Sequence, residues 1–329
     1  MSKKITISDF LRLAVPLSEV DRKIVAMLQA DGRESYAQIA REIGVAEKTV
    51  RNRVRDLIDE GVLQITAVTD PATLGYGAAA LLGLVTNPKV PTSKIVERLK
   101  TIAAIDYLVT ATGRFAIYAE ILCRDMKTLQ GRIETEIGPI DGIVSIEVFP
   151  YLSLHYQNAH FASARIKGEE EYGVRPRELD HTDKKIVRAL SEDGRAPFQQ
   201  IADMLGVSEA QVRLRVKHLT ESRTVDVIAL INPMGLEYRT MAWVALRAAP
   251  GHRVLDLADA LARLPNTTYV AICAGRFDIF AEFICGSERE LLEVIDNDVR
   301  RWPSVAHAEI SIYIDLQYKR LTPIRDDDD

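Results

Sequence analysis

Cysteine is scarce in this chain of 329 residues: it has three, and none belongs to a Cys-x-x-Cys pair. This scarcity argues against a disulfide-rich secreted scaffold and a structural zinc site, and it fits a reducing compartment. Cys123 and Cys285 lie in apolar segments, where cysteine behaves as a small buried hydrophobic residue. The six histidines show no metal-ligand spacing with cysteines or carboxylates, so we expect no metal.

Long apolar runs and catalytic motifs are missing as well. No run approaches the roughly 20 apolar residues that span a bilayer, and the N-terminus lacks the apolar core of a signal peptide. We therefore expect a cytoplasmic protein without membrane contact. No Ser/His/Asp or Gly-x-Ser-x-Gly arrangement occurs. GYGAAA (75–80) precedes an expected strand instead of opening a helix, so it does not predict a dinucleotide site, and we expect no cofactor.

An excess of positive charge is also absent. Lys and Arg number 42 against 47 Asp and Glu, which gives a net charge of −5 and a pI near 5.8. This balance counts against a nucleic-acid partner unless positive charge is concentrated locally. It is concentrated in KTVRNRVR (48–55), which contains Lys48, Arg51, Arg53 and Arg55.

What the chain does contain is a long internal duplication, at an offset of 162 positions (from residue 20 to residue 182). VDRKIVAMLQADGR (20–33) matches TDKKIVRALSEDGR (182–195), and ATGRFAIYAEILC (111–123) matches CAGRFDIFAEFIC (273–285). A repeat of this length is a duplicated set of domains and not a solenoid unit, whose period is about 20–50 residues.

Each copy begins with helical periodicity and continues with strand-like patterns. In the first copy, helices are expected to begin near Ser18, Ser35 and Glu47, with glycines ending the second at Gly44 and the third at Gly61. Strand patterns follow at 62–70, 78–86, 106–113, 114–123 and 143–156, with amphipathic helices at about 92–103 and 125–137. The predicted fold class is α+β: two copies of a winged helix-turn-helix, each followed by a ferredoxin-like β-α-β-β-α-β unit.

The basic segment coincides with the second helix of the helix-turn-helix, the helix that enters the major groove in such motifs. If Val50, Val54 and Leu57 are buried, most of the polar side chains lie on the opposite face. The predicted DNA-binding residues are Lys48, Arg51, Asn52, Arg53 and Arg55, with Arg213, Arg215 and Lys217 in the second copy. An ordinary solvated helix is the alternative, which the preceding helix, the glycine turn and the second copy disfavour.

The two copies differ on this face. Ala210 replaces Lys48, and Leu214 replaces Asn52, where an apolar residue is awkward unless it touches a thymine methyl group or packs on a neighbour. Arg223 stands in place of Gly61. We therefore predict that the first copy reads sequence and that the second contributes mostly phosphate contacts.

The pattern IAxxIGVxxxxVRxRVxxL, followed by a β-α-β-β-α-β unit with a Gly-Arg-Phe-Asp turn, resembles the Lrp/AsnC (feast/famine) family of transcription regulators. The resemblance covers nearly the whole chain, twice. It implies a winged helix-turn-helix joined to a ligand-sensing RAM domain, pairing through the sheets, and a small effector, often an amino acid, bound between RAM domains. It also aligns Arg53 and Arg215 with an arginine of the family's recognition helix, either to anchor phosphate or to brace the fold. The presence of two modules in one chain suggests that one polypeptide forms internally the pair that relatives form from two chains.

The resemblance also places the effector near the Gly-Arg-Phe-Asp turn of the second copy. The predicted effector-binding residues are Gly275, Arg276, Phe277, Asp278, Glu309, Ser311 and Tyr313. A carboxylate at Asp278 can pair with an ammonium group, and Gly275 lets backbone amides approach a carboxylate. The alternative is that the glycine only allows the turn and the aspartate only caps it. Ala116 replaces the aspartate in the first copy, which suggests a different effector there or none.

The predicted organisation has seven parts: an N-terminal extension (1–16), helix-turn-helix 1 (17–62), RAM domain 1 (63–156), a linker (157–178), helix-turn-helix 2 (179–224), RAM domain 2 (225–321) and an acidic tail (322–329). The predicted function is a sequence-specific transcription regulator, not an enzyme, which binds double-stranded DNA and a small effector and forms a homo-oligomer. Two alternatives stay open. One is an enzyme like the sirohaem decarboxylases, which resemble this family but carry a His/Tyr/Arg cluster that is not evident here. The other is an effector-binding assembly protein that has lost DNA binding.

Overall fold

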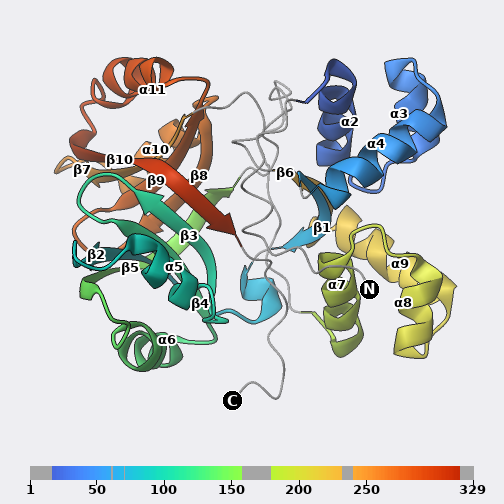
Figure 1. Cartoon of the computed structure of the whole chain (residues 1–329), viewed down its shortest axis with the longest axis horizontal. Helices are drawn as coiled ribbons and strands as arrows, with labels where there is room; N and C mark the ends of the chain where they lie inside the picture. The colour runs from blue at the N-terminus through green and yellow to red at the C-terminus, as the bar shows by residue number, and fades with distance from the viewer. Residues whose placement is uncertain (1–16, 61, 70, 158–178, 232–239, 319–329) are drawn as a thin grey trace. The chain divides into compact units, whose positions relative to one another are not determined.

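The computed structural model describes residues 17–60, 62–69, 71–157, 179–231 and 240–318. The predicted extension 1–16, all but the first residue of the linker 157–178, the tail 322–329 and Gly61 lie outside these residues. The chain divides into two units (Figure 1): a helical unit within Met1–Gly75 and Ala159–Leu236, and a barrel unit of Tyr76–Asn158 and Glu237–Lys319. Among the described residues, no helix combines the length and the apolar character needed to cross a membrane.

The first three helices of the helical unit begin and end where local chemistry dictates. Helix α2 (Glu19–Ala30) starts at a capping box between Ser18 and Asp21, and α3 (Tyr36–Ile43) starts at Ser35, whose side chain accepts from the amide of Gln38. Gly44, with φ of 74°, ends α3 in the left-handed conformation that glycine adopts without strain. Helix α4 (Glu47–Asp59) follows after a turn. This is the predicted helix-turn-helix.

The second copy repeats the arrangement with α7 (His181–Glu192), α8 (Phe198–Leu205) and α9 (Glu209–Glu221). The strands β1 (Leu63–Thr69) and β6 (Val225–Ile231) join the two copies as an antiparallel pair. Thr66 lies opposite Ile228, which is the equivalent residue of the second copy at the offset of 162 positions. The pairing is therefore centred on a pseudo-twofold axis.

Reciprocal hydrogen bonds surround this axis. The amide of Gly32 donates to the carbonyl of Val227 at 2.7 Å, and that of Gly194 donates to Ile65 at 2.9 Å. The Arg33 guanidinium donates to the carbonyl of Gly194 at 2.6 Å, while that of Arg195 donates to Gly32 at 2.7 Å. The guanidinium groups also lie over aromatic rings of the opposite copy, Arg33 over Phe198 and Arg195 over Tyr36. These contacts hold the two helix-turn-helix copies together within one chain.

The glycines at this junction allow a first prediction. A β-carbon at Gly32 would lie 2.8 Å from the carbonyl oxygen of Val227, and one at Gly194 would lie 2.8 Å from the amide nitrogen of Thr66. We expect Gly32→Ala/Gly194→Ala to lower the free energy of unfolding by about 1–3 kcal/mol per site, because backbone atoms cannot easily move aside. Urea unfolding monitored by circular dichroism measures the loss.

Gly206→Ala in the same unit is the control. A β-carbon there meets no atom within 4 Å, and only its positive φ of 68° opposes the change. We expect a loss of about 1 kcal/mol. If the double variant lost no more than this control, close packing at the junction would be refuted.

In the barrel unit, each copy has the predicted β-α-β-β-α-β order (Figure 1). The elements of the first copy are β2 (Ala78–Thr86), α5 (Thr92–Leu99), β3 (Ile105–Ala111), β4 (Ile117–Cys123), α6 (Met126–Arg132), the π-helical turn η2 (Ile133–Ile137) and β5 (Ile143–Gln157). Those of the second are β7 (Thr240–Ala248), α10 (Val254–Ala262), β8 (Thr267–Cys273), β9 (Ile279–Cys285), α11 (Glu288–Val294), the π-helical turn η4 (Ile295–Val299) and β10 (Val305–Tyr318). The α+β fold class is confirmed. One difference is that the helix expected at 125–137 ends at Arg132 and continues as a π-helical turn.

The eight strands form one closed barrel in the order β10-β3-β4-β2-β5-β8-β9-β7. The pairs β5–β8 and β10–β3 join the two copies. Alternate strand residues face opposite sides. In the first copy, Leu82, Leu84 and Ile121 pack with α5 residues such as Ile95 and Leu99 in one hydrophobic core, and the second copy has an equivalent core. The chain thus pairs its two RAM-like halves internally, as the duplication suggested.

Candidate nucleic-acid interface and ligand site

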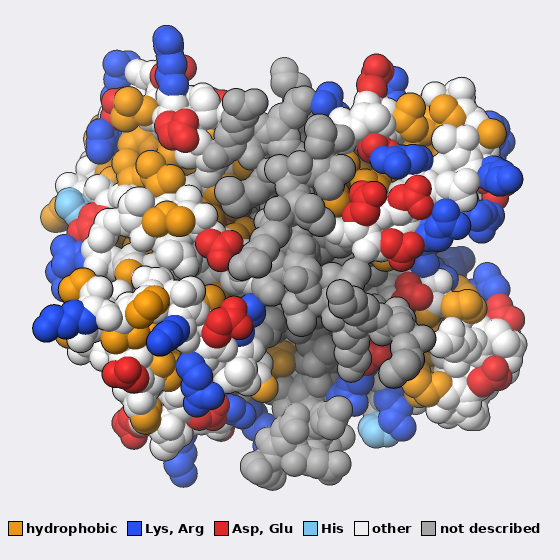
Figure 2. Space-filling view, viewed as in Figure 1, with side chains coloured by type: hydrophobic (Ala, Val, Ile, Leu, Met, Phe, Trp, Pro, Cys, Tyr) orange, Lys and Arg blue, Asp and Glu red, His pale blue; other side chains and the backbone are white. Residues whose placement is uncertain are grey.

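The recognition helix α4 presents the predicted face. Val50, Val54 and Leu57 are at most 1% exposed and fix the buried side. Lys48, Arg51 and Arg55 are exposed, and Asn52 is half-buried. Figure 2 shows Lys and Arg side chains among acidic ones over the helices of this unit.

The exposed arginines of α4 have only weak internal partners. Arg51 pairs with Glu47 at 2.6 Å and lies 5.2 Å from the centre of the Tyr36 ring, while Arg55 pairs with Asp56 at 3.2 Å. The Arg51 and Arg55 side chains are 62% and 64% exposed. Exposed pairs of this kind contribute about 0–1 kcal/mol, so either arginine can exchange its partner for a DNA phosphate at little cost.

Arg53 has a different role. Its guanidinium donates two hydrogen bonds of 2.8 Å to the carboxylate of Asp21, which is 1% exposed and belongs to the capping box of α2. Burial alone would raise the pKa of Asp21, but the hydrogen bonds from Arg53 and Ser18 outweigh it and hold that pKa below its usual value. Of the two interpretations of Arg53, these contacts support the brace.

Arg215 repeats this arrangement, with Nη1 2.7 Å from Asp180 and 2.8 Å from Asp183. Sequence reasoning named the two arginines but missed their acidic partners. The only signal was that Asp21 and Asp183 recur at equivalent positions near the starts of α2 and α7.

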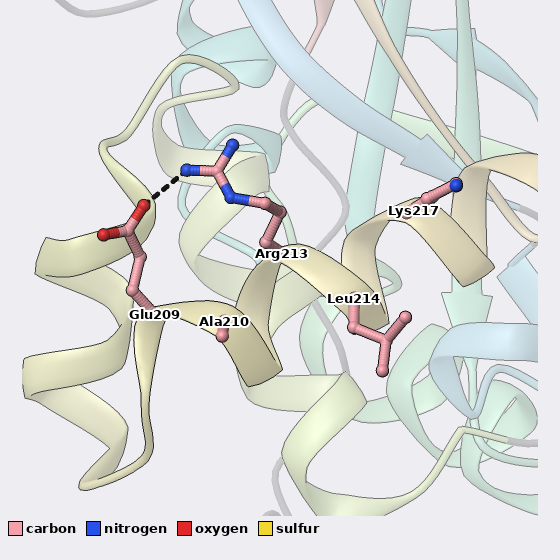
Figure 3. A pocket seen from close by; sticks show the side chains of 5 residues that line it. All are labelled: Glu209, Ala210, Arg213, Leu214 and Lys217. Atoms are coloured by element: carbon pink, nitrogen blue, oxygen red, sulfur yellow. Dashed lines mark hydrogen bonds and ion pairs between the residues drawn. The ribbon is translucent and has the colours of Figure 1, made fainter.

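The second recognition helix has the predicted differences. Arg213 pairs with Glu209 and lies 5.3 Å from the centre of the Phe198 ring, and Lys217 is 3.6 Å from Glu221. Leu214 is 68% exposed. One face of α9 lines a shallow hollow of about 460 Å³ (Figure 3), formed by Glu209, Ala210, Arg213, Leu214 and Lys217. Helix α9 begins with a capping box at Ser208, whereas α4 begins at Ala46 without a side-chain cap.

The predicted effector residues fall into two groups in the barrel unit. The turn at Gly275 has φ of 127°, and the Arg276 side chain there pairs with Glu147 at 2.8 Å. Asp278 is half-buried and accepts from the amide of Ala248 at 2.9 Å. The aspartate therefore caps the backbone, as expected if Gly275 only allows the turn and Asp278 only caps it. Its second carboxylate oxygen does not take part in this hydrogen bond.

Glu309, Ser311 and Tyr313 lie along β10. Glu309 pairs with Arg114 at 3.1 Å, the equivalent of the Arg276–Glu147 pair. Ser311 and Tyr313 are buried, and their hydroxyls bond to Tyr118 and Glu282 at 2.8 Å. His307 on β10 connects the two groups: its ring stacks on Phe277 with ring centres 6.2 Å apart, and its Nε2 lies 3.3 Å from Glu309. Ser311 and Tyr313 thus face the barrel interior.

Comparisons with known proteins decide the family. A model of the AsnC-type helix-turn-helix domain matches residues 17–58 and again 179–220, and a model of a C-terminal dimeric alpha+beta barrel domain of AsnC type matches 252–322. An uncharacterized HTH-type transcriptional regulator of Pyrococcus abyssi is 39% identical over 134 residues, 40% of this chain and 84% of that protein. The chain belongs to the Lrp/AsnC family. The resemblance seen in the sequence is confirmed.

Other Lrp/AsnC relatives match at the length of a single module. The HTH-type transcriptional regulator LrpA of Pyrococcus horikoshii is 31% identical over 40% of this chain and 92% of its own length. The regulatory protein AsnC of Haemophilus influenzae is 26% identical over 40% of this chain and 88% of its own length.

A solved structure matches across both modules. The siroheme decarboxylase NirDL aligns with a TM-score of 0.61 over 93% of this chain and 94% of that chain, at 15% identity. Identity this low shows a shared fold and nothing about activity.

Two glutamates inside the Lrp/AsnC barrel were not anticipated: Glu282 is buried and Glu120 is half-buried. Glu282 accepts from the hydroxyls of Tyr107 and Tyr313 and, at 2.6 Å, from that of Thr268. Its equivalent, Glu120, accepts from Tyr269 at 2.7 Å. The available signal was the glutamate within each apolar strand, YAEILC and FAEFIC.

These glutamates predict a pH effect. Burial, reinforced by the charge of Glu282, raises the pKa of Glu120 from 4.5 to about 7. The folded state therefore holds a proton that the unfolded state releases, so this group lowers stability as pH rises from 4.5 to 7. We expect Glu120→Gln, whose amide oxygen can still accept from Tyr269, to raise the free energy of unfolding at pH 8 by up to about 3 kcal/mol and to have little effect near pH 4.5. Urea unfolding at both pH values measures this difference, and equal effects would contradict it.

Proposed function

We propose that this Lrp/AsnC chain is a sequence-specific, DNA-binding transcription regulator whose DNA affinity or assembly responds to a small effector, an amino acid or related metabolite. The observation that carries the proposal is the helical unit, where two recognition helices with exposed cations are joined by the pseudo-twofold pairing of β1 and β6. Twofold-related recognition helices are the arrangement that addresses two half-sites on double-stranded DNA.

Charge placement supports DNA as the partner. The chain is acidic overall, yet Lys48, Arg51 and Arg55 share the exposed face of α4, and Arg213 and Lys217 share that of α9. Cations that neutralise phosphates give affinity that falls steeply with salt. The acidic remainder of the chain reduces attraction to DNA elsewhere.

An amino-acid effector fits the charged turns of the barrel unit. Its carboxylate and ammonium can exchange with the Arg276–Glu147 and Arg114–Glu309 pairs, near the remaining predicted residues. By binding one arrangement of the chain more tightly than another, the effector shifts their populations and so alters DNA affinity or assembly.

Association of several chains is part of the proposal. Internal pairing already uses the barrel edges, so further contacts need another surface. Leu152 on β5 and Ile314 on β10 occupy equivalent positions and are 70% and 62% exposed. Exposed apolar side chains such as these are suited to a symmetric contact between chains.

The decarboxylase alternative rests on fold alone. Phe149, Phe277 and Phe280 are at most 1% exposed and pack against one another, with Phe149 and Phe280 ring centres 4.8 Å apart. Aromatic packing inside the barrel favours a structural interior over a macrocycle site. Coloured material that copurifies with the protein would favour the enzyme.

A mobility-shift assay of the purified full-length chain on its own upstream DNA tests the proposal, with and without a mixture of the standard amino acids. We expect specific retardation that competitor DNA of unrelated sequence does not remove and that the mixture alters. Retardation that the mixture does not alter would refute the proposal of an amino-acid effector. Absence of any retardation would refute the proposal that the chain is a DNA-binding regulator.

Asp278→Asn separates the two interpretations of the effector turn. The asparagine oxygen can still accept from the amide of Ala248 while the negative charge is lost. We expect DNA affinity without effector to stay within about twofold and the effector concentration for half-maximal response to rise at least about tenfold, as loss of a charged contact implies. Titration of the mobility shift with the active amino acid measures both. An unchanged response would mean that Asp278 only caps the turn.

A further inference from the structure

The two recognition helices present different chemistry at equivalent positions. Arg51 corresponds to Arg213, and Arg55 to Lys217, so the flanking cations are kept. Beside these cations on the helix surface, Lys48 and Asn52 on α4 correspond to Ala210 and Leu214 on α9. A polar pair on one helix is thus an apolar pair on the other.

Leu214 is not accounted for by packing inside the protein. It is 68% exposed, and Figure 3 shows its side chain projecting from α9 between Ala210 and Lys217. Val212, Val216 and Leu219 form the buried side of the same helix. Of the two uses that the sequence left open for Leu214, packing on a neighbour is therefore not found in the described part of the chain.

The hollow beside Leu214 suits a base edge. Ala210 has no side chain beyond its β-carbon, so the surface beside Leu214 is apolar, and the shallow hollow of about 460 Å³ extends from this pair to Glu209, Arg213 and Lys217. Figure 3 shows Arg213 and Lys217 together on one side of Ala210 and Leu214, with Arg213 paired to Glu209. Apolar side chains contact the C5-methyl group of thymine in the major groove, whereas asparagine bonds bidentately to adenine. Arg213 and Lys217, which lie on one side of this apolar pair and form only exposed ion pairs, can contact the phosphates that border the groove.

We infer that this chain recognises a non-palindromic DNA duplex. One half-site is read by Lys48 and Asn52, and the other contains an A·T pair whose thymine methyl group meets Leu214. Because both helices belong to one chain paired around Thr66 and Ile228, every molecule carries one helix of each kind. This inference rests on the proposed DNA-binding function. It departs from the sequence-based prediction that the second copy contributes mostly phosphate contacts, because it gives the second helix a direct part in sequence recognition.

Selection from a random-sequence duplex library with the full-length chain tests the inference, using two symmetrised variants beside the wild type. Ala210→Lys/Leu214→Asn gives α9 the two polar residues of α4, and Lys48→Ala/Asn52→Leu gives α4 the apolar pair of α9. Circular dichroism checks that each variant is folded. Positions 48, 210 and 214 are exposed and 52 is half-buried, so we expect both variants to fold.

The wild type is expected to enrich a motif with two different half-sites, preferring thymine at one position by about fivefold or more. Each symmetrised variant is expected to enrich a palindrome built from one of those half-sites, with the spacing unchanged. A wild-type motif whose two half-sites read by one chain are identical, or a motif specified in only one of those half-sites, would overturn the inference. Failure of every protein to enrich any duplex would overturn the DNA-binding function as well.

Discussion

Replacing Arg51 and Arg55 together with alanine is expected to weaken binding to operator DNA by about a hundredfold or more at physiological salt. Both side chains are more than 60% exposed and form only surface ion pairs within the protein. Each lost phosphate contact also lowers the slope of log affinity against log salt by about 0.9, so we expect the slope to fall by nearly two. Fluorescence anisotropy of a labelled duplex at several salt concentrations gives both quantities.

Arg289→Ala/Arg300→Ala is the matched control. These arginines of the barrel unit are 88% and 51% exposed and pair with acidic residues four positions away, as Arg51 does. Their removal changes the net charge equally but leaves both recognition helices intact. If the control weakened binding as much as the α4 variant, general electrostatic attraction would explain the affinity and α4 would lose its assigned role.

Arg53→Ala is expected to lower the free energy of unfolding of the helical unit by about 3 kcal/mol. The change leaves the carboxylate of Asp21 buried without its charged partner, and such losses amount to about 3–5 kcal/mol. We place the loss at the lower end because the Arg53 side chain is 36% exposed. Urea unfolding of the full-length chain monitored by circular dichroism measures it.

The second copy supplies the comparison. Arg215 meets Asp180 and Asp183, which are 54% and 19% exposed, so Arg215→Ala is expected to cost about 1 kcal/mol. The pKa of Asp21 lies below its ordinary value of 3.8, so the stability from this pair is present above pH 3.8 and is lost as pH falls through the folded-state pKa. The Arg53→Ala deficit should therefore shrink in acid. If both substitutions lowered the free energy of unfolding equally, or if the Arg53→Ala loss did not depend on pH, the assignment of Arg53 as a structural brace would be contradicted.

Local signals were enough to predict most of the elements. Ser18 and Ser35 cap the starts of helices and Gly44 ends one, each through contacts with residues of the adjacent helical turn. The helix boundaries that they predict agree closely with the structure. Strand periodicity likewise placed β2 at residues 78–86, as observed. The face of α4 followed from the spacing of its apolar residues.

Contacts between distant segments could not be predicted in this way. The Arg53–Asp21 pair spans 32 positions, and the hydrogen bond from Arg33 to Gly194 spans 161. Nothing local distinguishes Arg53 from the exposed arginines beside it. The positions of Ser311 and Tyr313 in the barrel interior likewise depend on strand pairing between the two copies. This pairing joins strands that are far apart in the sequence, so local patterns do not reveal it.

The salt dependence of wild-type binding to the chain's own upstream duplex tests the central claim most directly. If the chain is a DNA-binding regulator, binding should be saturable and tighter than to a scrambled duplex. Affinity should also fall by roughly 10²–10³-fold between about 50 and 200 mM salt, as about five phosphate contacts imply. Binding that is absent at low salt, or indifferent to both sequence and salt, would contradict it.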